Sequence, residues 1–257
     1  MQRPAGRETV TLKAIANKLP SWLKRPLMDV RARLFDTYAV KSYSQEGEDL
    51  ILLRMFDKQP SGFYVDVGAH HPRRFSNTFN FYRRGWTGIN IDPNPDAMRS
   101  FESARSRDIN IQCGVADGPG TLTYYRFDEA ALNTFDRELV ESRLANTRYK
   151  LIGNIEVRVE GLAAILERHL PVNQAIDFLT IDAEGMDLQV LKSNDWKRYR
   201  PRCVLVESLG VSLEDALRGE VFLFMRNQGY ELFARTFNTL VFRECADGGI
   251  DRPRKIQ

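Results

Sequence analysis

The sequence predicts an α/β protein built on a doubly wound sheet, and three observations support this fold class. The apolar run at residues 63–67 stops at a glycine turn, and a second apolar run at 89–91 stops at Asp92, a spacing typical of a βαβ unit. Short apolar segments alternate with segments of helical periodicity along most of the chain. Acidic residues lie at the end of one predicted strand after another. We therefore expect a small-molecule site at the carboxyl ends of the strands.

The predicted elements of the first half follow the order of a parallel sheet. A helix at 44–57 follows from apolar residues that share one face and from acids in its first turn. Strand 63–67 leads through a crossover helix at 75–84 into strand 89–91, and Pro95 suits the first turn of a helix at 95–105. Strand 109–115 precedes a Gly-Pro-Gly turn, after which residues 121–127 alternate like a short extra strand.

The second half begins with a polar segment at 128–154, where we expect a lid over the substrate and one helix at 137–144. A strand at 155–159 and a helix at 162–169 follow it. Residues 176–181 and 203–206 are nearly continuous apolar runs, which suit strands buried on both faces. A helix at 213–227 ends before Gly229, and residues 230–234 and 239–243 form an expected antiparallel pair.

Length and composition fit one large domain with an appendage. The chain has 257 residues, of which 43% are hydrophobic, enough for a sizeable core. It has no apolar run of membrane-spanning length and no signal-peptide pattern, so we expect a cytoplasmic protein. Cys113 and Cys203 lie in apolar strand-like runs and Cys245 completes an odd number, which predicts buried thiols rather than a disulfide framework or a metal cluster.

Residues 1–41 form a basic N-terminal extension to a main domain at 42–245 and a tail at 246–257. The extension holds nine Lys or Arg against three Asp or Glu, whereas the rest of the chain has a net charge of −3. Apolar residues at helical spacing predict a short amphipathic helix from near Pro26, and we expect residues 1–10 to be disordered. The helix could contact anionic lipid at the inner membrane face or a lipid-linked substrate. We favour the alternative that it covers the substrate pocket or packs on a second subunit of a homo-oligomer.

The turn after the first strand indicates which cofactor the site takes. It has a single glycine followed by Ala69, His70 and His71, which is not the glycine pattern of a pyrophosphate site and disfavours NAD. A phosphate-binding loop is also missing, and S-adenosylmethionine, which carries adenosine without phosphate, fits better. Asp92 could accept both ribose hydroxyls, and Asp117 could accept from the adenine amino group.

Five motifs then resemble the FkbM family of S-adenosylmethionine-dependent methyltransferases: residues 43–49 (YSQEGED), 64–72 (YVDVGAHHP), 76–78 (SNT), 85–92 (GWTGINID) and 181–185 (IDAEG). The resemblance covers about residues 42–245. It implies a class I, Rossmann-like methyltransferase fold, with a seven-stranded sheet whose last strand is antiparallel, and methyl transfer to a hydroxyl of a sugar or natural-product scaffold. The chain departs from the family at His70-His71-Pro72, where many members have Asn-x-Gly. The cofactor-binding residues that we predict are Gln45, Asp66, Gly68, Ala69, Asp92, Val115 and Asp117.

The predicted catalytic residues are His70, His71 and Asp182. A sugar hydroxyl is a weak nucleophile unless a base or a metal assists it. Asp182 and Glu207 end neighbouring predicted strands and could hold one Mg²⁺, an arrangement similar to that in sugar O-methyltransferases of this fold. Either histidine could instead take the proton, or one could order the turn while the other lies in solvent. We expect Glu184 to cap the helix that follows it or to bond to the backbone.

Two other classes of function remain as alternatives. Nucleic-acid binding would require a basic face, but residues 42–257 have a net charge of −3, so we expect no nucleic-acid partner. An inactive methyltransferase fold that acts as a scaffold is the second alternative, and the acids Asp66, Asp92 and Asp182 argue against it. The sequence therefore predicts an S-adenosylmethionine-dependent O-methyltransferase that acts on a saccharide or glycosylated metabolite.

Overall fold

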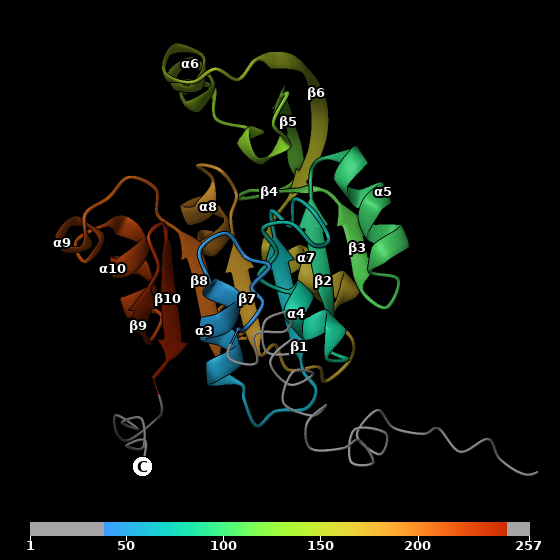
Figure 1. The fold of residues 1–257 in the computed structure, drawn as a ribbon, viewed down its shortest axis with the longest axis vertical. Helices are drawn as coiled ribbons and strands as arrows, with labels where there is room; N and C mark the ends of the chain where they lie inside the picture. The colour runs from blue at the N-terminus through green and yellow to red at the C-terminus, as the bar shows by residue number, and fades with distance from the viewer. Residues whose placement is uncertain (1–38, 246–257) are drawn as a thin grey trace, which may run out of the picture. The chain divides into compact units, whose positions relative to one another are not determined.

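The computed structural model describes residues 39–245, and the chain divides into two compact units between Lys41 and Ser42. The second unit holds a seven-stranded sheet with the order β3-β2-β1-β7-β8-β10-β9 (Figure 1). Five neighbouring strands are parallel, and β10 is antiparallel to both β8 and β9. The strands are β1 (Phe63–Val67), β2 (Thr87–Asp92), β3 (Ile109–Gln112), β7 (Phe178–Ile181), β8 (Cys203–Glu207), β9 (Tyr230–Arg235) and β10 (Thr239–Glu244). The predicted seven-stranded sheet with an antiparallel last strand is confirmed.

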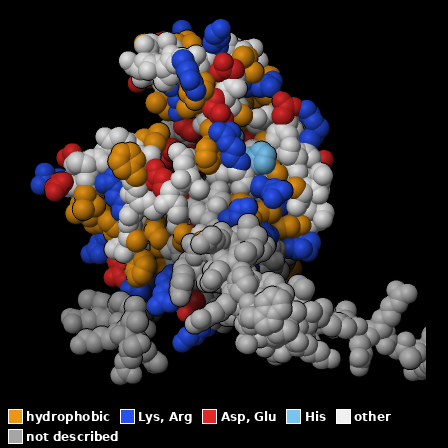
Figure 2. Space-filling model, viewed as in Figure 1, with side chains coloured by type: hydrophobic (Ala, Val, Ile, Leu, Met, Phe, Trp, Pro, Cys, Tyr) orange, Lys and Arg blue, Asp and Glu red, His pale blue; other side chains and the backbone are white. Residues whose placement is uncertain are grey.

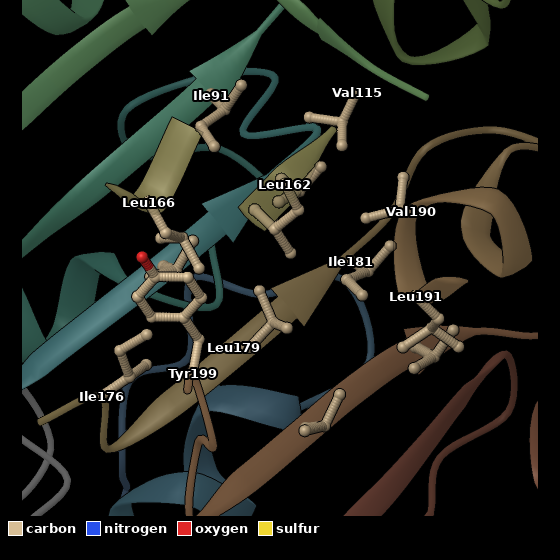
Figure 3. Close-up of a cluster of buried hydrophobic side chains, with 14 of the residues drawn as sticks. Ile91, Val115, Leu162, Leu166, Ile176, Leu179, Ile181, Val190, Leu191 and Tyr199 are labelled. Carbon is tan, nitrogen blue, oxygen red and sulfur yellow. The ribbon is translucent and has the colours of Figure 1, made fainter. Parts of the chain in front are cut away.

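Helices cover both faces of this sheet, so the central strands are buried on both sides. α3 (Glu48–Met55) and α4 (Phe79–Arg83) pack on the face where Tyr64 and Phe178 are buried. On the other face, strand residues such as Leu179 pack with residues of α7 (Leu162–His169) and α8 (Asp187–Lys192) (Figure 3). α9 (Leu213–Ala216) and α10 (Glu220–Asn227) contribute to the same core. α5 (Pro95–Ala104) lies beside β2 and β3. Neighbouring strand residues face opposite sides, so Tyr64 and Val65 belong to different cores.

A second, three-stranded sheet projects beyond the carboxyl ends of the parallel strands (Figure 1). It consists of β4 (Gly114–Val115), β5 (Gly120–Phe127) and β6 (Leu151–Glu160), and with η1 (Ala130–Leu132) and α6 (Arg137–Asn146) it forms the lid region, residues 114–160. This region is larger than the lid expected at 128–154. The predicted strand 109–115 breaks at Cys113, because its second part, β4, pairs with β6 instead of β2.

The helix predicted at 44–57 begins only at Glu48. Asp49 is fully buried and accepts hydrogen bonds from the hydroxyls of Ser42 and Ser44, at 2.7 and 2.9 Å. These bonds hold the residues before the helix in a turn, so the side chain of Asp49 organises the entry to α3. Local periodicity could not reveal this, because the partners lie outside the apolar face.

Two other predicted helices also differ from those in the structure. The helix expected at 75–84 is reduced to α4, because Phe75 has a φ of 56° and residues 76–78 after it are irregular. The helix expected at 213–227 is divided into α9 and α10 by the turn at Gly219. α8 is the helix that we expected after Glu184, for which the sequence analysis gave no bounds.

Several predictions concern the ends of the chain and its cysteines. The N-terminal amphipathic helix, the disorder of residues 1–10 and the tail at 246–257 lie outside the described residues. Cys113 and Cys203 are buried, as predicted, whereas Cys245 is exposed. Among the helices within residues 39–245, none has the length and apolar character needed to cross a membrane.

Candidate active site

A cavity opens at the carboxyl ends of β1, β2, β4 and β7, beneath the lid region. The space that it encloses, including the part that is open to solvent, measures about 610 Å³. The strand ends and the turns that follow them contribute Val67, Gly68, His70, Asp92, Val115, Asp182 and Glu184, and the lid region contributes Tyr124, Asn133, Thr134 and Phe135. The predicted location of the site at the strand ends therefore has a matching cavity.

Gly68 allows the chain to turn at the floor of this cavity. Its φ is 78°, and a Cβ atom at this position would lie 1.7 Å from the carbonyl oxygen of Asp182. The N–H groups of Gly68 and Ala69 both donate to the carbonyl of Ile91, at 2.9 and 3.2 Å. Only glycine fits here, because the ends of β1 and β7 approach too closely for a side chain.

Asp92 ends β2 and lies buried in the cavity wall. One carboxylate oxygen accepts from the N–H of His70 at 2.7 Å, and the other accepts from the N–H of Asn94 at 2.8 Å. Burial raises the pKa of Asp92 to about 6, although these two N–H groups favour the charged form. A carboxylate has about four acceptor positions, so both oxygens can still accept a further hydrogen bond.

The two adjacent histidines have different environments. The ring of His71 is exposed, and its Nδ1 accepts from the N–H groups of Arg73 and Arg74, both at 3.0 Å. His70 has a φ of 53°, its ring stacks on Phe75, and its Nε2 is buried without a hydrogen-bond partner among the described residues. Burial, with a contribution from Arg74, lowers the pKa of His70 to about 4. His71 therefore orders the turn, while His70 presents a neutral ring to the cavity.

Three acids converge at the ends of β7 and β8. Carboxylate oxygens of Asp182, Glu184 and Glu207 lie within 4.8 Å of one another. Burial, followed by the charge of Glu207, raises the pKa of Asp182 well above its usual range, and burial likewise raises the pKa of Glu207. One oxygen of Asp182, Oδ1, is buried without a hydrogen-bond partner in the part of the chain that the structure describes. Three charges this close are unfavourable, so the cluster favours binding a proton or a cation.

Arg143 of α6 joins the lid region to this acid cluster. Its guanidinium is paired with Glu184, and its Nη1 donates to the carbonyl of Leu132 at 2.7 Å. The hydroxyl of Thr134 donates to the carbonyl of Glu184 at 2.8 Å. The lid region is therefore fixed directly above the acids.

Glu184 does not cap α8, contrary to the prediction. Its φ of 48° turns the chain so that its carboxylate meets Asp182 and Glu207. Asp187 organises this turn instead, accepting from the N–H groups of Ala183 and Gly185 at 3.0 and 3.4 Å. Glu184 and Arg143 are candidate site residues that the sequence analysis missed. The Glu-Gly pair was an available signal, because glycine often accompanies a left-handed turn.

The structure brings together only part of the predicted site. Gly68, His70, Asp92, Val115 and Asp182 line one cavity, and Glu207 lies beside Asp182. Asp66 is buried beneath α4, where it accepts from the hydroxyl of Thr78 at 2.9 Å. The other predicted residues that do not line the cavity are Gln45, Ala69, His71 and Asp117; Gln45 and Asp117 are exposed, and Ala69 packs against Met98 and Phe101.

Comparisons with known proteins give one family and several solved structures. Residues 66–232 match the family model of the methyltransferase FkbM domain. No curated protein matches the chain. Among solved structures, a TehB-like S-adenosylmethionine-dependent methyltransferase from Corynebacterium glutamicum is 11% identical, with 87% of this chain and 100% of that chain covered and a TM-score of 0.40. A methyltransferase from Geobacter sulfurreducens is 15% identical, with 91% and 94% covered and a TM-score of 0.40.

Proposed function

This chain belongs to the FkbM family of S-adenosylmethionine-dependent methyltransferases, and we propose that it methylates a hydroxyl of a saccharide or glycosylated metabolite. The observation that carries the proposal is the acid cluster at Asp182 and Glu207, which adjoins the cavity that Gly68 and Asp92 line. Such a cluster can take a proton from a hydroxyl. A methyltransferase for a neutral amine or a thiolate would have less need of it.

The residues of the cavity fit S-adenosylmethionine, which supplies an electrophilic methyl group when bound. Because Gly68 has no side chain, its backbone is exposed at the floor of the cavity, and a side chain there would clash with the residue that follows β7. Asp92 has free acceptor positions for the two ribose hydroxyls. Val115 offers an apolar wall to the adenine, and Met186 also lines the cavity. Asp117 is exposed, so the proposed adenine contacts no longer include it.

The acid cluster would activate the acceptor hydroxyl. A hydroxyl oxygen becomes a better nucleophile as its proton moves to a base held within hydrogen-bond distance. Asp182 Oδ1 has no partner among the described residues, and carboxylate oxygens of Asp182 and Glu207 lie within 4.8 Å of each other, so together the two acids can receive and share that proton. Glu184 is paired with Arg143 and is therefore less available as a base.

The same residues fit a Mg²⁺ ion, and we propose that the reaction is Mg²⁺-assisted. Mg²⁺ prefers oxygen ligands and commonly binds through one or two carboxylates, with its other positions open to water or substrate. Asp182 and Glu207 would supply these carboxylates, and vicinal sugar hydroxyls could fill open positions. The ion would lower the pKa of a bound hydroxyl.

Methyl transfer to candidate acceptors tests the proposal. The chain is incubated with trideuteromethyl-labelled S-adenosylmethionine, Mg²⁺ and a panel of sugar nucleotides and surface polysaccharides, and products are located by mass spectrometry. We expect a labelled methyl ether on a sugar oxygen. Label on nitrogen or sulfur alone would contradict the assignment, and failure to bind S-adenosylmethionine in calorimetry would favour an inactive scaffold.

Variants then test the acids and the metal. Asp182→Asn with Glu207→Gln should lower turnover while leaving cofactor affinity nearly unchanged, and Glu214→Gln, an exposed acid on α9, is the control. Full activity in excess chelator would exclude the metal but leave the acids as the base. Full activity of the double variant would exclude both roles.

A further inference from the structure

We propose that the acceptor is amphiphilic, with an apolar portion that binds a ledge formed by Val211, Leu213 and Phe237 beside the acid cluster. This inference rests on the proposed function, because it takes the acceptor hydroxyl to lie at Asp182 and Glu207. It adds the chemical class of the acceptor, namely a hydroxyl-bearing polar head joined to an aliphatic or aromatic tail.

The ledge lies at the same end of the sheet as the acids. Glu207 pairs in register with Thr239 at the start of β10, and the N–H of Ser208 donates to the carbonyl of Asn238 at 2.6 Å. Phe237 comes directly before Asn238. Phe237 therefore lies in the turn that joins β9 to β10, two residues before Thr239, the register partner of Glu207. A tail attached to a hydroxyl-bearing head at the acids can reach this position.

The ledge exposes large apolar side chains around one hollow. Phe237 is 82% exposed and Leu213 is 51% exposed. Both line an open hollow of about 890 Å³ together with Val211 and Arg235. Figure 2 shows hydrophobic side chains gathered over the region of α9, α10 and β9. Single exposed apolar residues are ordinary, but a group of them around a hollow next to a reaction site indicates a binding surface.

The walls of the hollow are held in place without a ligand. Arg235 donates to the carbonyl of Val211, and also to that of Phe237 at 3.2 Å. Glu46 accepts from both the N–H and the side-chain amide of Asn238, each at 2.7 Å. Phe237 is therefore exposed on an ordered turn. A preorganised surface loses little entropy when it binds an apolar group.

Arg235 supplies a second, independent indication of a ligand. Its Nε is buried and has no hydrogen-bond partner within the described residues. A buried N–H donor without a partner is costly. Because Arg235 lines the hollow, a small movement of its side chain would bring this donor to an ether, ester or carbonyl oxygen of an acceptor. An amphiphile with an oxygen at the junction of head and tail would match both the apolar wall and this donor.

The acceptor is a better occupant of the ledge than a second copy of the chain. A protein partner seated on Phe237 would stand over the ends of β8 and β10, where Ser208 and Glu207 adjoin the acid cluster. It would obstruct the approach of a substrate to the acids. An acceptor tail uses the same apolar surface and delivers the hydroxyl to the acids as it binds.

Alkyl glucosides of increasing chain length test the proposal. Binding of methyl, butyl and octyl β-D-glucoside to the full chain is measured by calorimetry below the micelle concentration. Octyl glucoside should bind at least about 10-fold more tightly than methyl glucoside, since burying an apolar side chain of this size contributes about 1.5 kcal/mol or more. Phe237→Ala and Leu213→Ala should remove most of this difference. The controls Phe233→Ala and Leu223→Ala change residues that are 39% and 52% exposed but do not line the hollow, and they should keep it.

The proposal would be overturned if the three glucosides bound equally or not at all, or if the chain-length effect survived Phe237→Ala. It would also be overturned if maltose bound more tightly than octyl glucoside, because the hollow would then bind a second sugar ring rather than an apolar tail. Concentration-dependent dimerisation that Phe237→Ala abolishes would assign the ledge to a contact between copies instead. The proposed function fails separately, through the absence of methyl transfer to oxygen in the labelling experiment. Tail-dependent binding without methyl transfer would therefore leave the ledge standing and remove the activity.

Discussion

Replacement of Arg105 should destabilise the protein strongly and loosen the turn that carries His70. Arg105 is fully buried, and its guanidinium bridges elements that are far apart in sequence. Nε donates to the carbonyl of Pro72 at 2.9 Å, and Nη1 donates to the hydroxyl of Tyr64 at 2.9 Å and lies 3.4 Å from Asp108. Its second amino group donates to the hydroxyls of Ser76 and Thr78, at 3.0 and 3.2 Å. One side chain thus ties the segment after β1 to the sheet.

The size of the effect follows from the groups that the substitution would leave behind. Arg105→Met keeps an apolar chain of similar length but leaves the buried Asp108 without its cation and the Pro72 carbonyl without this donor. Breaking a buried pair by removing one partner costs about 3–5 kcal/mol. For a domain of about 200 residues, each kcal/mol lowers Tm by about 2–4 °C. Arg105→Met should therefore lower Tm by about 6–20 °C.

Thermal unfolding and calorimetric titration of cofactor measure the two consequences. Arg107→Met is the matched control, because Arg107 lies two residues away with an exposed side chain that donates to the Tyr82 carbonyl. Its cost should stay below about 1 kcal/mol. We also expect weaker S-adenosylmethionine binding by Arg105→Met, since the Pro72 carbonyl adjoins the turn on the cavity floor. Equal stability losses for the two variants would refute the argument from buried pairing.

Three further predictions concern the cavity and its surroundings. Asp92→Ala should weaken S-adenosylmethionine binding at least about 100-fold in calorimetry, because two hydrogen bonds to a charged group are lost; unchanged affinity would remove the ribose assignment. Arg74 and Glu129 form a two-pronged ion pair at 2.9 and 3.1 Å between the turn after β1 and the lid region. In a double-mutant cycle with Arg74→Ala and Glu129→Ala, the stability coupling should be below about 1 kcal/mol. The variants should nevertheless release the cofactor faster in stopped flow, and unaltered dissociation would show that this ion pair does not help to hold the cofactor. Burial raises the pKa of Asp66 from 3.8 to about 6, so its proton stabilises the native state fully below pH 3.8 and this contribution, about 3 kcal/mol, is lost as the pH rises through about 6. Asp66→Asn should remove this slope from urea unfolding between about pH 4 and pH 7, and an unchanged slope would count against it.

The sheet could be read from the sequence because its central strands are buried on both faces. Phe63–Val67 and Cys203–Glu207 are almost continuous apolar runs, as expected for strands that are buried on both faces. The ends of the helices were less predictable, because they depend on bonds between distant residues. Asp49, for example, receives the Asn80 amide at 2.6 Å as well as the hydroxyls before it. No local pattern encodes that partner.

The candidate site was predictable where it depends on a short motif and unpredictable where it depends on folding. Gly68 and Asp92 follow directly from strand ends, and the structure places both in the cavity. For Asp66, the sequence already held the information that argues against a place in the cavity. Side chains alternate along a strand, so Asp66 must face away from Val67, which lines the cavity. Glu184 and Arg143 meet only because a left-handed turn and the lid region bring them together.

The environments of the acids and the histidines separate their roles in the proposed reaction. A general base works best when its pKa lies near the working pH. Burial lowers the pKa of His70 to about 4, which makes its ring a poor proton acceptor, and His71 uses its Nδ1 to order the turn. Burial and the charges of neighbouring acids instead raise the pKa values of Asp182 and Glu207, which strengthens their affinity for a proton or a cation. Proton removal therefore belongs with the acids in this proposal, and His70 shapes the cavity in which the hydroxyl approaches them.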